Sequence, residues 1–132
     1  MLLPTPTAAQ FRKATASSPQ QACVMVYRDN HRTLLWDDKL AGPAVRPVPL
    51  AECLVLDHAQ FEEFQQAIRA GAPITGALIV TRNADGLYAF SAAPRCRAAI
   101  GSTTLLFDRR EYTAFVHGVR HYEFEAELVS TR

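Results

Sequence analysis

The sequence predicts an α+β protein in which two β-β-β-α units share a single core. An apolar run, an Asp and a helical pattern at residues 54–71 return at residues 105–120, at a constant offset of 51 positions from Asp57 to Asp108. Short apolar runs that end at turn residues precede each segment, as expected for strands. At 132 residues the chain can bury one core of useful size but not two. The two units are therefore expected to form one domain.

The first unit, residues 11–73, is expected to contain three strands and a helix. The apolar runs 23–27 and 33–36 are separated by a short polar stretch, which indicates a β-hairpin, and residues 52–56 supply the third strand. Residues 40–50 contain three prolines, which lack the N–H group that a strand needs. That stretch is therefore expected to be an excursion on the surface.

Each unit is expected to end in a helix. Asp57 and Asp108 can each cap a helix by accepting hydrogen bonds from its first free N–H groups, and Gly71 ends the first helix. At about three turns, neither helix would be stable alone in water. Both helices must therefore pack on a sheet, through one apolar stripe formed by Phe61, Phe64 and Ile68 in the first and by Tyr112, Phe115, Val116 and Val119 in the second.

The second unit, residues 74–130, repeats this order, with strands expected at 77–81, 87–90 and 103–107. A turn at residues 83–86 contains a glycine that can adopt a positive φ angle. The strands of both pseudo-symmetric units are expected to share one mainly antiparallel sheet or an open barrel, with both helices packed on it.

A further strand is expected at the C-terminus, because apolar and acidic residues alternate there with the period of a half-buried strand. The acidic side consists of Glu123, Glu125 and Glu127. These carboxylates could steer a basic partner, or they could only protect an edge strand from unwanted pairing. Both interpretations stay open.

The single domain is expected to span residues 1–132, with residues 1–10 as a flexible N-terminal arm, because they contain two prolines and no periodicity. The formal net charge of +1 argues against direct binding of nucleic acid, which needs clustered cations. The sequence contains no apolar run of about 20 residues that could span a membrane, and no pattern of a signal peptide. We therefore expect a cytoplasmic protein.

Three parts of the chain carry a family resemblance. Residues 11–18 combine an aromatic residue, a basic pair and a Ser/Thr-rich stretch, and they precede Cys-Val-Met-Val at residues 23–26. Residues 35–39 read Leu-Trp-Asp-Asp-Lys, and residues 105–124 end in Gly-Val-Arg-His-Tyr-Glu-Phe. Together these motifs resemble the family of small actinobacterial proteins called domain of unknown function 397, present here as two tandem copies.

The chain departs from that family at several positions. Phe11 stands where the family usually has Trp, Met25 stands where it usually has Glu, and the second copy lacks the basic head. The resemblance implies a non-catalytic regulatory protein that acts through a helix-turn-helix transcription regulator. Whether that action is antitoxin-like or toxin-like stays open, as does the formation of a homodimer.

The expected surface for contact with that regulator has two parts. The first combines Trp36, Asp37 and Asp38 with the proline-rich stretch that includes Pro47. The second is the acidic C-terminal strand.

An alternative function is a small-molecule-binding or thiol-dependent enzymatic domain with a pocket between the two copies. Its candidate is Cys96, because guanidinium groups on both sides favour the reactive thiolate, together with one of the histidines. His117 and His121 lie four residues apart, but a zinc site needs three or four ligands, so we expect them to interact with the helix C-terminus. No catalytic residue, metal or cofactor is predicted.

Overall fold

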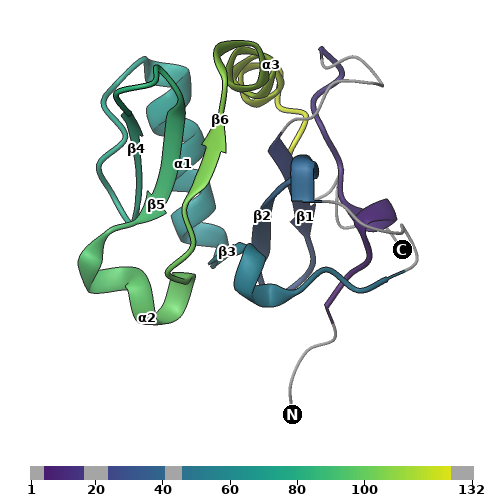
Figure 1. The fold of residues 1–132 in the computed structure, drawn as a ribbon. Helices are drawn as coiled ribbons and strands as arrows, with labels where there is room; N and C mark the ends of the chain where they lie inside the picture. The colour runs from purple at the N-terminus through teal and green to yellow at the C-terminus, as the bar shows by residue number, and fades with distance from the viewer. Residues whose placement is uncertain (1–4, 17–23, 41–45, 126–132) are drawn as a thin grey trace.

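The computed structural model describes residues 5–16, 24–40 and 46–125. These residues form an α+β fold with two three-stranded antiparallel sheets and three α-helices. In Figure 1 the sheet with β4, β5 and β6 lies to the left, the sheet with β1 and β2 lies to the right, and α3 lies above them. The predicted fold class is confirmed at this level.

The first sheet has the strand order β1-β2-β3 and consists of β1 (Val24–Arg28), β2 (Thr33–Asp37) and β3 (Leu54–Leu56). All neighbours are antiparallel. The strand β3 leads directly into α1 (His58–Ala70). These elements lie where the sequence predicts them, within about two residues at each end.

The second sheet has the same order, β4-β5-β6, with β4 (Leu78–Arg82), β5 (Tyr88–Ala92) and β6 (Leu105–Phe107). The strand β6 leads into α3 (Arg109–Arg120). A short helix that the sequence did not predict, α2 (Arg97–Ile100), lies between β5 and β6. Apart from α2, the second half therefore has three strands followed by a long helix, as the first half does.

Both long helices begin at the predicted cap. The Asp57 side chain accepts a hydrogen bond from the Gln60 backbone N–H at 2.7 Å, and the Asp108 side chain accepts one from the Glu111 N–H at 2.8 Å. Such bonds satisfy N–H groups that have no partner within the helix. The first helix ends at Gly71, whose φ of 67° lies in the left-handed region that glycine tolerates best.

The predicted single sheet or open barrel is not confirmed. The described strands pair within two separate three-stranded sheets, and no ladder of hydrogen bonds joins one sheet to the other among them. The halves are joined instead by side chains, because residues of both sheets and of both long helices belong to one hydrophobic cluster.

Phe64 of α1 lies at the centre of this shared core and is 3% exposed. Its ring centroid lies 5.8 Å from that of Phe90 on β5 and 5.9 Å from that of Phe115 on α3. Aromatic pairs at such distances add to the free energy gained from burial. One side chain of the first half thus contacts both the sheet and the helix of the second half.

The C-terminal ends of α1 and α3 also exchange polar contacts. The Arg69 Nε–H donates to the carbonyl of Val119 at 3.1 Å, and the Arg120 guanidinium donates to the carbonyl of Ile68 at 3.4 Å. Arg69 and Arg120 occupy equivalent positions at the offset of 51, as do Ile68 and Val119. Each helix therefore makes the same kind of contact with the other.

The first sheet is buried on both faces. One face belongs to the shared core, and the other forms a second hydrophobic cluster with Met25, Leu34 and Trp36. Phe11 covers this second cluster, and its ring centroid lies 5.3 Å from that of Trp36. Arg12 makes two backbone hydrogen bonds with Val26, of 2.7 and 2.8 Å, so residues 11–12 extend the edge of β1.

The described part of the predicted arm, residues 5–10, lies against the body of the protein. Pro6 is buried, and its carbonyl accepts a hydrogen bond from the Val48 N–H at 2.8 Å. Thr7 forms an isolated bridge with Pro47, and residues Ala8–Gln10 form a 3-10 turn. Residues 1–4 lie outside the described part of the chain.

The predicted C-terminal strand is wrong for the residues that the structure describes. Residues 121–124 form a turn after α3, in which Tyr122 has a φ of 59° and the Glu123 N–H donates to the carbonyl of Gly118. Tyr122 is 54% exposed while Phe124 is fully buried, so they do not share a face as the alternation predicted. Residues 126–132, including Glu127, lie outside the described residues.

We predict that Phe64→Ala lowers the free energy of unfolding by about 3–5 kcal/mol, because it leaves a cavity where the two halves meet. Urea denaturation followed by circular dichroism measures the change. The matched control is Gln66→Ala on the exposed side of the same helix, which should stay within about 0.5 kcal/mol of the original protein. Equal stability of the two variants would contradict the shared core.

Candidate functional site

Two of the predicted contact residues, Trp36 and Pro47, line a common cavity of about 140 Å³ on the protein surface. We call this cavity the Trp36 groove; it is lined by Ala8, Trp36, Leu40, Arg46, Pro47, Val48, Pro49 and Glu52. The Trp36 Nε1–H donates to the Glu52 carboxylate at 3.1 Å, which holds the indole ring in place. At the groove Leu40 is 49% exposed, and nearby Leu50 is 42% exposed. The groove therefore combines a fixed aromatic wall with exposed apolar side chains.

The neighbouring aspartates are not equivalent. Asp37 is 6% exposed and accepts a hydrogen bond from the Lys39 backbone N–H, and the Lys39 ammonium lies 3.2 Å from its carboxylate. The same ammonium contacts the buried carboxylate of Glu111 on α3 at 2.9 Å. Asp38 is half-buried at the start of a 3-10 turn. Through Lys39, Asp37 therefore links the two halves of the fold. Of the two aspartates, Asp38 is the one with a partly exposed carboxylate.

This environment also shifts the pKa of Lys39. Partial burial works against its charge, but hydrogen bonds and charge attraction from Glu111 and Asp37 raise the pKa of Lys39 above its usual value. The ammonium lies 4.9 Å from the centre of the Phe107 ring, which gives a cation–π contact as well. Lys39 is therefore held as a cation between the halves.

The predicted acidic C-terminal surface is not formed by Glu123 and Glu125. Glu123 accepts hydrogen bonds from the backbone N–H and the hydroxyl of Thr15, at 2.9 and 2.6 Å. Glu125 contacts the Arg69 guanidinium at 3.1 Å. The Glu123 carboxylate therefore binds a residue near the N-terminus, and the Glu125 carboxylate binds a residue of α1.

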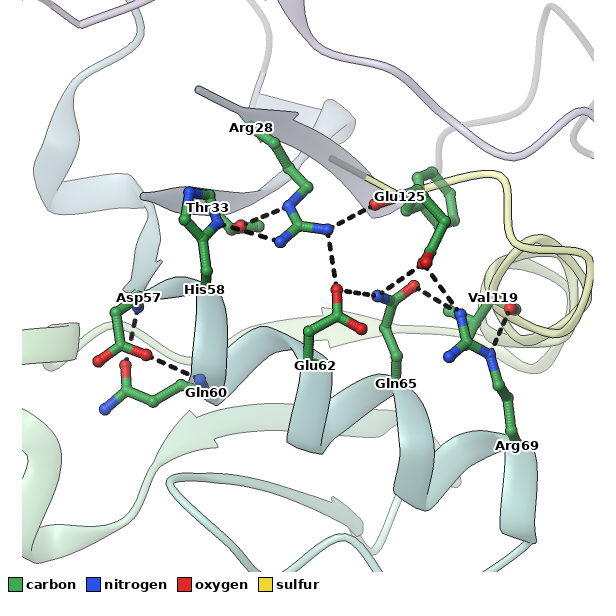
Figure 2. A network of polar contacts seen from close by, with 11 residues as sticks. Arg28, Thr33, Asp57, His58, Gln60, Glu62, Gln65, Arg69, Val119 and Glu125 are labelled. Atoms are coloured by element: carbon green, nitrogen blue, oxygen red, sulfur yellow. Dashed lines mark hydrogen bonds and ion pairs between the residues drawn. The ribbon is translucent and has the colours of Figure 1, made fainter. Parts of the chain in front are cut away.

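A cluster of polar and ionisable groups surrounds Arg28, which is 2% exposed (Figure 2). Its guanidinium donates to the Thr33 hydroxyl at 2.9 Å, to the Glu62 carboxylate at 3.2 Å and to the backbone carbonyl of Phe124 at 2.9 Å. Its remaining nitrogen lies 3.0 Å from His58 Nδ1. Because a guanidinium can only donate, His58 accepts this hydrogen bond at Nδ1. These contacts satisfy a buried charge that would otherwise be costly.

The cluster continues along α1 toward the C-terminal segment. The Gln65 side-chain amide donates to Glu62 and to Glu125, both at 3.3 Å, and Glu125 also accepts from Arg69. Figure 2 shows Glu62, Gln65 and Arg69 in a row along α1, with Glu125 of the C-terminal segment opposite them. We call the set Arg28, His58, Glu62, Gln65, Arg69 and Glu125 the polar clasp, because it joins β1 and α1 to the residues after α3.

Sequence reasoning did not identify the polar clasp. A signal existed, since Glu62, Gln65 and Arg69 lie at i, i+3 and i+7 and therefore form a polar row on one helix face. A polar row is usually solvated, however, and nothing in the sequence pairs it with Arg28 or Glu125. The clasp bonds mainly within itself, which indicates a structural role.

The thiols differ in environment. Burial, together with the Glu52 charge, raises the pKa of the Cys53 thiol to about 12. Cys96 is half-buried in the turn before α2 and packs against the shared core. It does not line the Trp36 groove. Cys23 lies outside the described part of the chain.

The two histidines at the end of α3 contact each other. The rings of His117 and His121 stack with centroids 4.0 Å apart, and His121 Nδ1 lies 2.8 Å from the His117 carbonyl. Within the described ranges, His, Cys, Asp and Glu form no group of three or more that could hold a metal ion.

We predict that Glu123→Gln destabilises the protein at neutral pH by about 1 kcal/mol, through weaker hydrogen bonds with Thr15. Partial burial opposes ionisation of Glu123, but the Thr15 hydrogen bonds and the nearby His117 and His121 lower the pKa of its carboxyl below the usual value. A lowered folded-state pKa gives stability that is fully present above the unfolded-state pKa, about 4.3, and is lost as the pH falls through the folded-state pKa.

The difference between Glu123→Gln and the original protein should therefore be constant near pH 7 and shrink below about pH 4.3. Urea denaturation at a series of pH values measures it. Asp85→Asn, a change in an exposed turn, is the control and should show no comparable loss at pH 7. A loss of stability for Glu123→Gln that persists unchanged in acid would contradict the stabilising role of the ionised Glu123 carboxylate.

We predict that Cys53 is protected from alkylation in the folded protein. With a thiol pKa of about 12, only about one molecule in 10,000 carries the thiolate at pH 8. Iodoacetamide labelling followed by peptide mass spectrometry tests this, and the same reaction in denaturant serves as the control. Equal labelling rates at Cys53 in the two conditions would refute the buried environment.

Comparisons of the chain with models of protein families, with curated proteins and with solved structures each find no match. The resemblance to the family of unknown function therefore stays a prediction. In the part of the chain that the structure describes, every helix is too short or too polar to cross a membrane.

Proposed function

We propose that the chain is a cytoplasmic, non-catalytic module that regulates a helix-turn-helix transcription regulator by direct contact. The observation that carries this proposal is the Trp36 groove, whose lining combines an aromatic ring, a proline-rich rim and the exposed Leu40, and whose lining residue Pro49 is followed in the chain by the exposed Leu50. Grouped apolar side chains on a surface are typical of protein-binding sites.

The geometry of the groove fits an interface with one anchoring side chain. Its volume of about 140 Å³ is suited to a single apolar residue of a partner. Trp36 is fixed from below by Phe11 and at its nitrogen by Glu52, so little freedom is lost on binding. Trp36 is itself only 2% exposed, so its contribution is to give the groove a rigid floor against which a partner side chain would pack.

The identity of the partner rests on the family resemblance alone. Leu40 in the lining of the groove and Leu50 beside its rim residue Pro49 would contact the apolar side of a helix. Asp38, two residues before Leu40, would face basic residues of the kind that DNA-binding domains carry. The polar clasp supports a non-catalytic function, because its donors and acceptors are used within the chain.

We also infer that the two β-β-β-α units are copies related by an approximate two-fold rotation. At the offset of 51, Phe64 is equivalent to Phe115, and their rings contact each other, as expected for residues near the axis. Arg69 donates to Val119 and Arg120 donates to Ile68, and the offset of 51 makes Arg69 equivalent to Arg120 and Ile68 equivalent to Val119. In a two-fold interface each contact occurs in both directions.

The test uses the full chain and the helix-turn-helix regulator encoded by the neighbouring reading frame. We predict that Leu40→Ser with Leu50→Ser weakens binding at least about tenfold, because both side chains lose buried area in the complex. Calorimetry measures the affinity. The fluorescence of Trp36, the single tryptophan, reports independently on contact at the groove.

The matched control is Leu106→Ser, which changes a leucine of similar exposure, 38%, that does not line the groove. It should bind as the original protein does. An unchanged affinity of the double variant would exclude the groove as the contact surface, and absence of any binding would exclude this class of partner.

A further inference from the structure

A second cavity, separate from the Trp36 groove, lies along α3. Its volume is about 370 Å³, within the range of sites for small ligands. Ala16 and Ala114 supply its apolar part, and the rest of its lining consists of side chains that can donate hydrogen bonds: Arg109, Arg110, Thr113 and His117. We call this cavity the Arg109 groove.

The spacing along α3 places these donors together. Arg109, Thr113 and His117 are four residues apart and therefore lie in one row on the helix surface. Arg110 and Ala114 form the adjacent row, also four residues apart. Two guanidinium groups, a hydroxyl and an imidazole thus border one opening.

The two arginines of the groove differ from most others in the fold. Arg28, Arg69, Arg82 and Arg120 all bond to carboxylates or carbonyls of the chain. Within residues 5–16, 24–40 and 46–125, Arg109 and Arg110 have no hydrogen bond or ion pair, and both are exposed.

The carboxylates nearest to this groove are already engaged. Asp108 caps α3 by accepting from the Glu111 N–H, Glu111 is bound by Lys39, and Glu123 accepts from Thr15. Within the described residues, intramolecular ion pairs therefore do not neutralise Arg109 and Arg110. The two residues are adjacent and line one cavity, so an anion bound there would contact both guanidinium groups.

We propose that the Arg109 groove binds a small phosphate monoester with an apolar body. Guanidinium groups present paired N–H donors that match phosphate oxygens, and the Thr113 hydroxyl and the His117 ring add further donors in the same row. Three phosphate oxygens can use this many donors better than the two oxygens of a carboxylate. The apolar body would lie against Ala16 and Ala114. This site does not depend on the Trp36 groove or on a protein partner.

The experiment titrates the full ¹⁵N-labelled chain with phenyl phosphate, inorganic phosphate and benzoate, each followed by NMR chemical shifts. We expect saturable shifts along α3, with phenyl phosphate bound most tightly, because it supplies both the dianion and the apolar body. Arg109→Gln with Arg110→Gln should weaken phenyl phosphate at least about tenfold. Thr113→Val is a second variant that retains both arginines and should weaken it less.

The matched control is Arg95→Gln with Arg97→Gln, which removes the same number of exposed guanidinium groups at a place that does not line the groove. This variant should bind phenyl phosphate as the original chain does. Equal losses in the two double variants would show attraction by overall charge and would overturn the proposal. Binding of benzoate as tight as that of phenyl phosphate, or an absence of saturable shifts on α3, would overturn it as well.

Discussion

The structure depends on one constraint: neither β-β-β-α unit can bury its apolar surface by itself. A three-stranded sheet with one helix of three turns leaves an open face, and such a helix is not stable alone in water. Phe64 shows the solution, since it contacts Phe90 and Phe115 of the other half. Burying one such side chain contributes about 1.5–3 kcal/mol, and the benefit exists only when both halves are present.

Polar contacts then determine how the two halves fit together. Lys39 joins β2 to α3 through Glu111, and Arg28 joins β1 to α1 and to the residues after α3. Burying these cations carries a desolvation cost, so such pairs contribute more to a defined geometry than to net stability. The hydrophobic core brings the halves together, and these directional contacts restrict their relative orientation.

The same constraint explains where function can be located. The shared core uses residues of both sheets, and the polar clasp uses ionisable groups of β1, of α1 and of the residues after α3. What remains is on the outside, and there the two halves differ. The first half has a cavity beside Trp36, while α3 of the second half has a cavity bordered by Arg109 and Arg110, which form no ion pair with the described residues. The proposed regulator-binding surface and the proposed anion site are compatible because they lie on different elements.

The sequence by itself determined the strands β1 to β6 and the two long helices, because strand alternation, helical stripes and the caps at Asp57 and Asp108 depend on residues within a few positions of one another. Only the tertiary structure decided that the strands form two sheets, that the chain turns at Tyr122, and that Glu125 pairs with Arg69, 56 positions earlier. Alternating residues at 122–125 match a strand locally, but burial of Phe124 in the shared core favours the turn. Trp36 and Pro47 were predicted individually, whereas their common groove required packing by Ala8 and Val48. Contacts between distant segments depend on how whole elements pack, and local periodicity carries no information about that geometry.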